Sequence, residues 1–217
     1  MPHTTAQSDL AETQRIEAFS DGVFAIAITL LVLELKVPGV DEDAALGAML
    51  VAQWPHYIAL LTSFATIGIM WLNHHRLFRL IRRVDHTLLV LNALLLLGVT
   101  VVPFPTALIA THLGHPGGRV AAAVYSGTFV FVAIAFNALW RYASSPRRKP
   151  SLLGPPHDSP EVRAVHRQYA FGPLIYLAAF LLGLGSPIAG VALDLGLALF
   201  FAFPPRGAKR RGVEPVG

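Results

Sequence analysis

Long apolar runs alternate with short polar stretches along the chain. Six runs approach the length of a membrane-spanning helix, since about 20 mostly apolar residues, each rising about 1.5 Å, cover the ~30 Å hydrocarbon core of a bilayer. The pattern predicts an all-α integral membrane bundle of six transmembrane helices. The last two runs are short and are separated only by Gly185 and Ser186, which leaves one tight hairpin of thinner reach as an alternative. The expected spans are residues 17–36, 54–75, 86–110, 120–140, 169–184 and 187–203.

Prolines mark two places where regular helix should stop. Pro103 and Pro105 each remove a backbone donor, so the third helix should kink or locally unwind there. Residues 144–160 are rich in proline, serine and basic residues, which favours an irregular linker between the fourth and fifth helices.

Lys and Arg are distributed unevenly between the predicted loops. With the N-terminus inside, all of the 17 except Lys36 and Arg119 fall on the cytoplasmic side, where short loops of membrane proteins are enriched in Lys and Arg. Asp41, Glu42 and Asp43 gather in the first external loop. Both termini are then cytoplasmic in a multi-pass protein of the cell membrane. The expected organisation is a cytoplasmic N-terminal tail (1–14), a six-helix transmembrane domain (15–203) with a cytoplasmic linker at about 144–160, and a basic cytoplasmic C-terminal tail (204–217).

Composition narrows the function classes. Hydrophobic residues make up 54% of the chain and charged residues only 14%, well below the roughly 25% charged content of soluble domains. The basic residues that give the net charge of +4 lie beside apolar spans. They are expected to orient the helices in the membrane, and they give no reason to expect a nucleic-acid partner. The absence of cysteine removes disulfides, thiolate metal sites and cysteine nucleophiles. The apolar spans also offer no convergent catalytic set, so no enzyme and no cofactor is expected.

The first predicted helix has two different faces. At 100° per residue, an apolar stripe with a single hydroxyl falls within about 60° of Ile26, and Asp21 points about 140° away from it. An ionised carboxylate in a membrane costs about 3 kcal/mol or more unless it is paired. The second helix supplies Asn73, His74 and Arg76 at matching depth, which predicts an interhelical polar clamp around Asp21. The stripe consists of Phe19, Gly22, Ile26, Thr29, Leu30 and Leu33.

Three motifs resemble a known family. The pattern Arg15-x-x-x-Phe19-Ser20-Asp21 is followed by Ile26-x-x-Thr29-Leu30, and the second helix reads Trp71-Leu-Asn73-His74-His75-Arg76. Together with Pro103-Phe-Pro105-Thr106 in the third helix, they resemble prokaryotic members of the transmembrane protein 175 family of potassium channels. The resemblance covers roughly the first 140 residues.

The resemblance implies a potassium channel whose pore is lined by the first helix. A chain with one copy of the six-helix unit is implied to be a homotetramer in the lipid bilayer, with potassium as the permeant ion. By position, Ile26, Leu30 and Leu33 match the apolar layers that constrict the family's pore, and Thr29 matches its hydroxyl layer. Ser20 and Asp21 face away from the stripe, and the signature residues are interpreted as a structural polar clamp: Arg15, Phe19, Ser20, Asp21, Trp71, Asn73 and His74.

The residues agree with this interpretation but leave alternatives open. No Thr-Val-Gly-Tyr-Gly filter loop is present, so a ring of apolar side chains that gates by dewetting is the expected device. Without the motifs, an Ile/Leu stripe indicates lipid contact or bundle packing. The alternative function is a proton-coupled secondary transporter, with Asp194 or the Asp21–His74 pair as the protonatable site. His74 and His75 diverge by 100° on a helix, so no metal site is expected.

Overall fold

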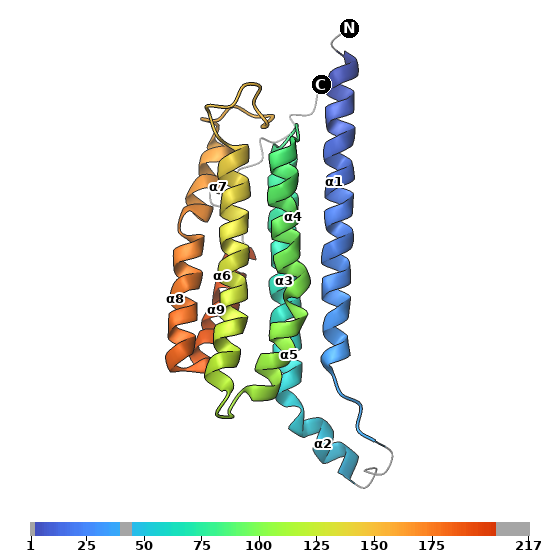
Figure 1. Cartoon of the computed structure of the whole chain (residues 1–217), viewed down its shortest axis with the longest axis vertical. Helices are drawn as coiled ribbons and strands as arrows, with labels where there is room; N and C mark the ends of the chain where they lie inside the picture. The colour runs from blue at the N-terminus through green and yellow to red at the C-terminus, as the bar shows by residue number, and fades with distance from the viewer. Residues whose placement is uncertain (1–2, 40–44, 203–217) are drawn as a thin grey trace, which may run out of the picture.

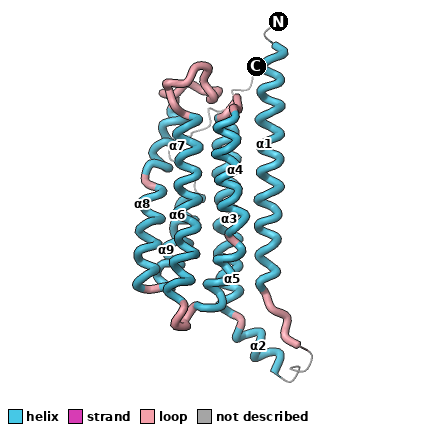
Figure 2. The backbone as a smooth tube through the Cα atoms, viewed as in Figure 1, coloured by secondary structure: helices cyan, strands magenta, loops and turns pink. Residues whose placement is uncertain are grey.

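The computed structural model describes residues 3–39 and 45–202, with side chains described from residue 8 onward. Within these residues the regular structure is helical apart from one isolated β-bridge between Ile81 and Leu153 (Figure 2). The all-α prediction is therefore confirmed for the described chain. The expected external acidic cluster at 41–43, Phe203 and the basic tail 204–217 lie outside the described residues.

Helix α1 (His3–Leu30) begins much earlier than expected and continues as a single 3-10 turn, η1 (Leu31–Glu34). Hydropathy located only its apolar part, because residues 3–14 are polar. These residues contain no glycine or proline, so nothing in them interrupts a helix. The N-terminal stretch expected as a tail is helical from His3, and Lys36 lies beyond the helix end.

The second and third predicted spans are present. A short helix that was not predicted, α2 (Leu46–Ala52), precedes α3 (Trp54–Leu80). The third span consists of α4 (His86–Val101) and α5 (Pro103–His112), broken at Val102. The interruption expected from the Pro-Phe-Pro sequence is confirmed. Asp85 caps α4 by accepting a hydrogen bond from the Leu88 amide at 2.9 Å.

The second half of the chain departs from the expected spans. Helix α6 (Gly118–Ala143) is followed by the irregular linker, and then by α7 (Pro160–Ala170), α8 (Gly172–Gly185) and α9 (Pro187–Ala202). The fifth span is longer than predicted, because α7 and α8 together form an apolar segment of 26 residues, Pro160–Gly185. By length and composition, five described segments are able to cross a membrane, whereas α9 has only 16 residues.

The helices form one elongated bundle with α1 at its edge (Figure 1). Helix α1 packs against α3 and α4, while α6 lies between α4 and α5 on one side and α8 and α9 on the other. The linker after α6 returns to the α3–α4 turn, where the Leu152 carbonyl accepts hydrogen bonds from the amides of Arg82 and Arg83. The main body of the protein thus stands beside α1 and leaves much of that helix uncovered.

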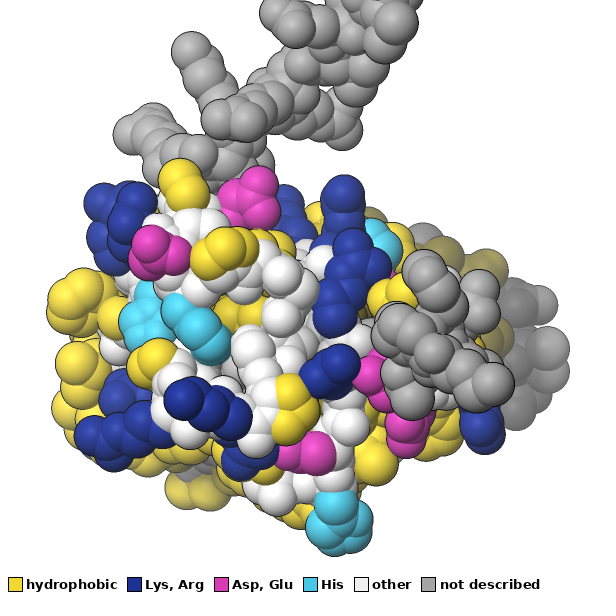
Figure 3. Space-filling model, turned by 90° about the horizontal axis from the view of Figure 1, so that it is seen from above, with side chains coloured by type: hydrophobic (Ala, Val, Ile, Leu, Met, Phe, Trp, Pro, Cys, Tyr) yellow, Lys and Arg dark blue, Asp and Glu magenta, His cyan; other side chains and the backbone are white. Residues whose placement is uncertain are grey.

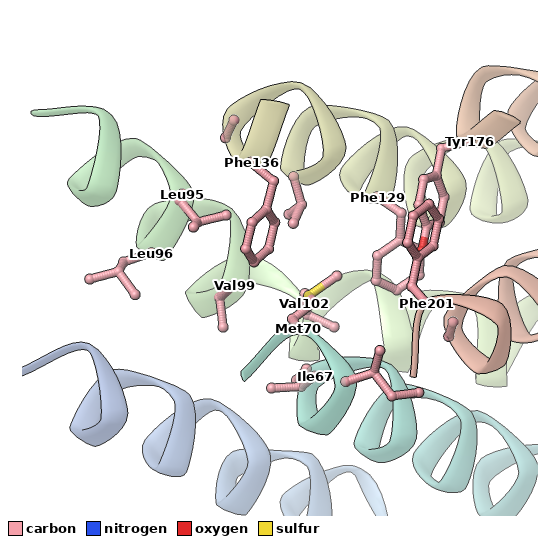
Figure 4. Close-up of a cluster of buried hydrophobic side chains, with 14 of the residues drawn as sticks. Ile67, Met70, Leu95, Leu96, Val99, Val102, Phe129, Phe136, Tyr176 and Phe201 are labelled. Carbon is pink, nitrogen blue, oxygen red and sulfur yellow. The ribbon is translucent and has the colours of Figure 1, made fainter. Parts of the chain in front are cut away.

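The interior is filled by aliphatic and aromatic side chains from α3, α4, α6, α8 and α9. Figure 4 shows Phe129, Tyr176 and Phe201 gathered where α6, α8 and α9 meet. The α8–α9 hairpin is closed by two glycines, since a Cβ atom at Gly190 would lie only 2.6 Å from the Gly183 Cα. This interior is therefore packed with side chains of a single copy of the chain.

Candidate functional site

Helix α1 has one buried and one exposed face. Its buried positions lie about 100° to 160° around the helix from Ile26 at 100° per residue. The expected stripe is open, with Ile26 60% and Leu33 72% exposed, and with Phe19, Thr29 and Leu30 also on the surface. The protomer therefore uses the face opposite the stripe for its own packing. The buried positions are Thr13, Ser20, Phe24 and Ala27 on α1, and Leu31 at the start of η1.

This apolar face has no cover within the protomer. Of the most apolar window of Ser8–Glu34, only 22% is buried, against 44% in the segments that contain α4 and α6. Large exposed apolar patches indicate contact with lipid, with another protein or with a functional passage. Helix α1, which carries this face, lies at the edge of the bundle (Figure 1).

Thr29 supplies the only hydroxyl of the stripe. Its Oγ1 donates a hydrogen bond to the Ile26 carbonyl at 2.9 Å, so the hydroxyl proton is directed back to the helix. The oxygen lone pairs of the exposed Thr29 then remain available as acceptors. Leu33 lies in the 3-10 turn η1 and not in the α-helix, a change of geometry that the regular spacing did not reveal.

A buried polar network joins α1 to α3 and α4. The Asn92 side chain donates from Nδ2 to Ser20 Oγ at 3.0 Å, and its Oδ1 lies 2.9 Å from His74 Nε2. Ser20 Oγ in turn donates to the Ile16 carbonyl at 2.8 Å. Ser20, His74 and Asn92 are all buried. The network satisfies polar groups that would otherwise be costly inside a membrane bundle.

Two further contacts fix the same turn of α1. The Trp71 indole donates from Nε1 to Asp21 Oδ1 at 2.8 Å, and the His75 ring pairs with Glu17 through Nδ1. Positions 17, 20 and 21 are neighbours on a helix surface because they are three and four residues apart. Their partners come from two different helices, so these contacts define how α1 is rotated in the protomer.

The arrangement differs from the predicted clamp in its pairing. Asp21 accepts its hydrogen bond from Trp71 instead of a histidine. His74 is linked to α1 by hydrogen bonding through Asn92, and its ring packs against Phe24 with the centroids 5.4 Å apart. Asn73 accepts a hydrogen bond from Arg76 at 3.3 Å and lines a cavity of about 40 Å³ among α3, α6, α8 and α9. The predicted pairing was wrong because neighbouring positions on α3 point in directions 100° apart. The prediction used only the depth of these residues in the membrane, which does not distinguish those directions.

The remaining signature residues lie at the surface. Arg15 and Phe19 are both exposed on α1. Arg76 donates to the carbonyl of Ala202 at 2.9 Å and so holds the end of α9. The role of Glu17 was missed, although its spacing to Ser20 and Asp21 was a signal that could have identified it.

Asp194 is buried on α9 away from α1. Ser126 on α6 donates to its Oδ2 at 2.6 Å, while Oδ1 has no hydrogen-bond partner among the described residues. No group of three or more His, Cys, Asp or Glu side chains is placed to hold a metal ion in the part of the chain that the structure describes.

The chain is similar to known proteins over the helices that form this site. The family model described as endosomal/lysosomal potassium channel TMEM175 matches residues 15–103, the stretch that holds α1, α3 and α4. A potassium channel of Chamaesiphon minutus is 54% identical over 194 residues, which cover 88% of this chain and 94% of that protein. The chain belongs to the TMEM175 family.

Solved structures of the TMEM175 family share the fold. The crystal structure of a lysosomal potassium-selective channel TMEM175 homolog from Chamaesiphon minutus superposes with a TM-score of 0.78 and 52% identity, and covers 88% of this chain and 97% of that one. The endosomal/lysosomal proton channel TMEM175 of Homo sapiens is 34% identical over 60% of this chain, which corresponds to 28% of the human protein. The relatives of this TMEM175 protein are channels, which supports a non-enzymatic, multi-pass membrane protein.

Proposed function

We propose that the protein is a potassium-permeable channel whose pore is lined by the exposed face of α1 from several copies of the chain, four in the expected homotetramer. The observation that carries the proposal is the uncovered stripe of α1, which turns Ile26, Leu30 and Leu33 away from the protomer. The relative from Chamaesiphon minutus that is 54% identical is a potassium channel, and it aligns along 94% of its length.

The stripe provides both a barrier and a coordinating layer. Rings of Ile26 and Leu30 around an axis exclude water, which raises the barrier to any ion because the ion must shed hydration. Thr29, whose hydroxyl proton is bound to the Ile26 carbonyl, offers an oxygen next to this constriction. Leu33 on the 3-10 turn forms a further apolar layer toward the loop. The open and closed states then differ in the radius of these rings.

The channel is proposed to sit in the cell membrane with six crossings and both ends cytoplasmic. The Arg76 contact with Ala202 brings the end of α9 back to the region where α3 ends, as an even number of crossings requires. At about 1.5 Å per residue the 16 residues of α9 span about 24 Å, so this crossing needs local thinning or flanking residues to reach both faces.

The test is potassium flux into liposomes that contain purified protein of verified oligomeric size. Ile26→Ala should raise the flux by about tenfold, which requires the barrier to fall by only about 1.4 kcal/mol. The matched control is Ile134→Ala on α6, since Ile134 is also an exposed isoleucine, at 52% against 60% for Ile26. The control should conduct like the wild type.

Two results would overturn the proposal. One is flux in both variants equal to that of the wild type in oligomers of unchanged size. The other is flux that appears only under an imposed proton gradient and is indifferent to Ile26, which would favour the proton-coupled carrier and direct attention to the buried Asp194.

A further inference from the structure

A second site is suggested by a basic groove far from α1. It lies between the end of α6 and helix α7, has a volume of about 620 Å³, and is lined in part by Ser144, His157, Arg163, His166 and Arg167. Figure 1 places α7 on the side of the bundle away from α1. In the end-on view, Lys and Arg side chains are spread over this end of the molecule (Figure 3). The groove therefore does not belong to the proposed pore.

The two arginines of the groove are free to bind an anion. Arg163 and Arg167 are exposed and lie one helical turn apart on α7, so they face the same way. Neither forms an ion pair with another described side chain. A guanidinium group matches a phosphate geometrically, because its planar fork can donate two parallel hydrogen bonds.

A neighbouring groove at the same end of the molecule differs in that its arginines are paired. It is lined by Asp9, Arg83, Asp85 and Arg148, and its two arginines are already paired with the two carboxylates. The charge of these two arginines is thus compensated by carboxylates, which leaves Lys149 as the other basic residue of that groove. Both arginines of the α6–α7 groove, by contrast, form no ion pair with another described side chain.

The two histidines add further polar groups to the groove. Trp140 donates from Nε1 to His166 Nδ1 at 3.2 Å, which leaves Nε2 of a neutral His166 as its proton-bearing nitrogen and a possible donor. His157 is held by Ser151 through Nε2 at 3.3 Å, and its buried Nδ1 has no partner among the described residues. Both rings therefore hold nitrogen atoms that the protein itself does not use.

The position of the groove points to the membrane as the source of the anion. Helix α7 leads into the apolar α8 through Phe171, which is 63% exposed, and Leu174 on α8 is 64% exposed. These two residues follow Arg167 by four and seven positions and form an apolar strip after the basic residues of α7.

We infer that the α6–α7 groove binds the phosphate headgroup of an anionic phospholipid, with Arg163, Arg167 and His166 at the headgroup and Phe171 and Leu174 beside the acyl chains. Basic pockets next to membrane helices recognise such headgroups through charge and hydrogen bonding. A free phosphate ion shares the headgroup chemistry but would make no use of the apolar strip. The inference is independent of the proposed pore.

The experiment counts bound lipid on purified, intact oligomers by native mass spectrometry. Wild-type protein is titrated with phosphatidylglycerol and phosphatidylcholine in equal amounts, with and without inorganic phosphate as a soluble competitor. Wild type should prefer phosphatidylglycerol, and Arg163→Gln/Arg167→Gln should weaken this binding about 30-fold, since each basic residue near an anionic lipid contributes a factor of about five. The matched control, Arg141→Gln/Arg147→Gln, removes two exposed arginines of the same end that do not line the groove.

Retained preference in the control, together with its loss in the groove variant, supports the site. Equal losses in both variants would mean diffuse surface charge and would overturn it. Displacement of phosphatidylglycerol by inorganic phosphate at equal concentration would assign the groove to a free anion and overturn the lipid assignment. Wild-type protein with no preference for phosphatidylglycerol would overturn the inference without reference to any variant.

Discussion

Asn92 holds the proposed pore helix to the rest of the protomer, and Asn92→Ala should loosen it. The substitution removes the hydrogen bonds to Ser20 Oγ and His74 Nε2, at 3.0 and 2.9 Å. Hydrogen bonds between membrane helices contribute about 0.6 kcal/mol on average and up to about 1.7 kcal/mol, so two losses amount to about 1 to 3 kcal/mol. The upper part of that range is expected, because His74 is fully buried and its Nδ1 already lacks a partner among the described residues.

The assay compares unfolding of the purified oligomer in detergent with potassium flux in liposomes. The matched control is Asn137→Ala, which removes one hydrogen bond of 2.7 Å from Nδ2 to the Tyr169 carbonyl, on the α6 to α7 side of the bundle. We expect both variants to lose stability, but only Asn92→Ala to change the flux. If Asn92→Ala unfolds like the wild type, or changes flux no more than Asn137→Ala does, the positioning role of the network is refuted.

Two other substitutions test packing and the Asp21 contact. Gly190→Ala should destabilise the α8–α9 hairpin by about 1 to 3 kcal/mol in thermal unfolding, because its new methyl group would lie 2.6 Å from the Gly183 backbone. The control is Gly196→Ala on the same helix, whose methyl group would meet nothing within 4 Å. This control should be neutral or stabilising in the same assay. Trp71→Phe keeps an aromatic ring but loses the indole N–H that donates the 2.8 Å hydrogen bond to Asp21. The free energy of unfolding measured with denaturant should therefore fall by about 1 kcal/mol. An unchanged denaturation midpoint would contradict a stabilising role of that contact.

The fold was largely predictable from hydropathy because membrane helices must bury backbone polar groups within each segment. The break at Val102 followed from Pro103 and Pro105, which lack amide donors. The early start of α1 at His3 was not predictable in this way, since hydropathy detects apolar runs and this part of the helix is polar. The pairing of α7 with α8 into one long segment was missed for the same reason, because α7 is amphipathic and polar on one face.

The exposed and buried faces of α1 were predictable from the sequence, but the hydrogen-bond partners of its polar side chains were not. Periodicity separated the exposed Ile26 from the buried Ser20, since both lie on one regular helix. It could not identify which side chain meets Asp21, because that depends on the rotation of α3 relative to α1. Asn92, whose side chain links Ser20 to His74, comes from a third segment, and no spacing within one helix reveals a bridge supplied by another.

The polar contacts of α1 therefore determine the direction in which its apolar stripe faces. Glu17, Ser20 and Asp21 bind partners on two helices and fix the rotation of α1 within a single turn. Ile26 lies between one and two turns further along the same helix, and it has no need of contacts within its own protomer to face outward. A shift of α1 by one residue against its partners would turn Ile26 by 100° and take it out of any shared ring. In the proposed channel, the polar residues of α1 would thus act through the position that they impose on the apolar residues.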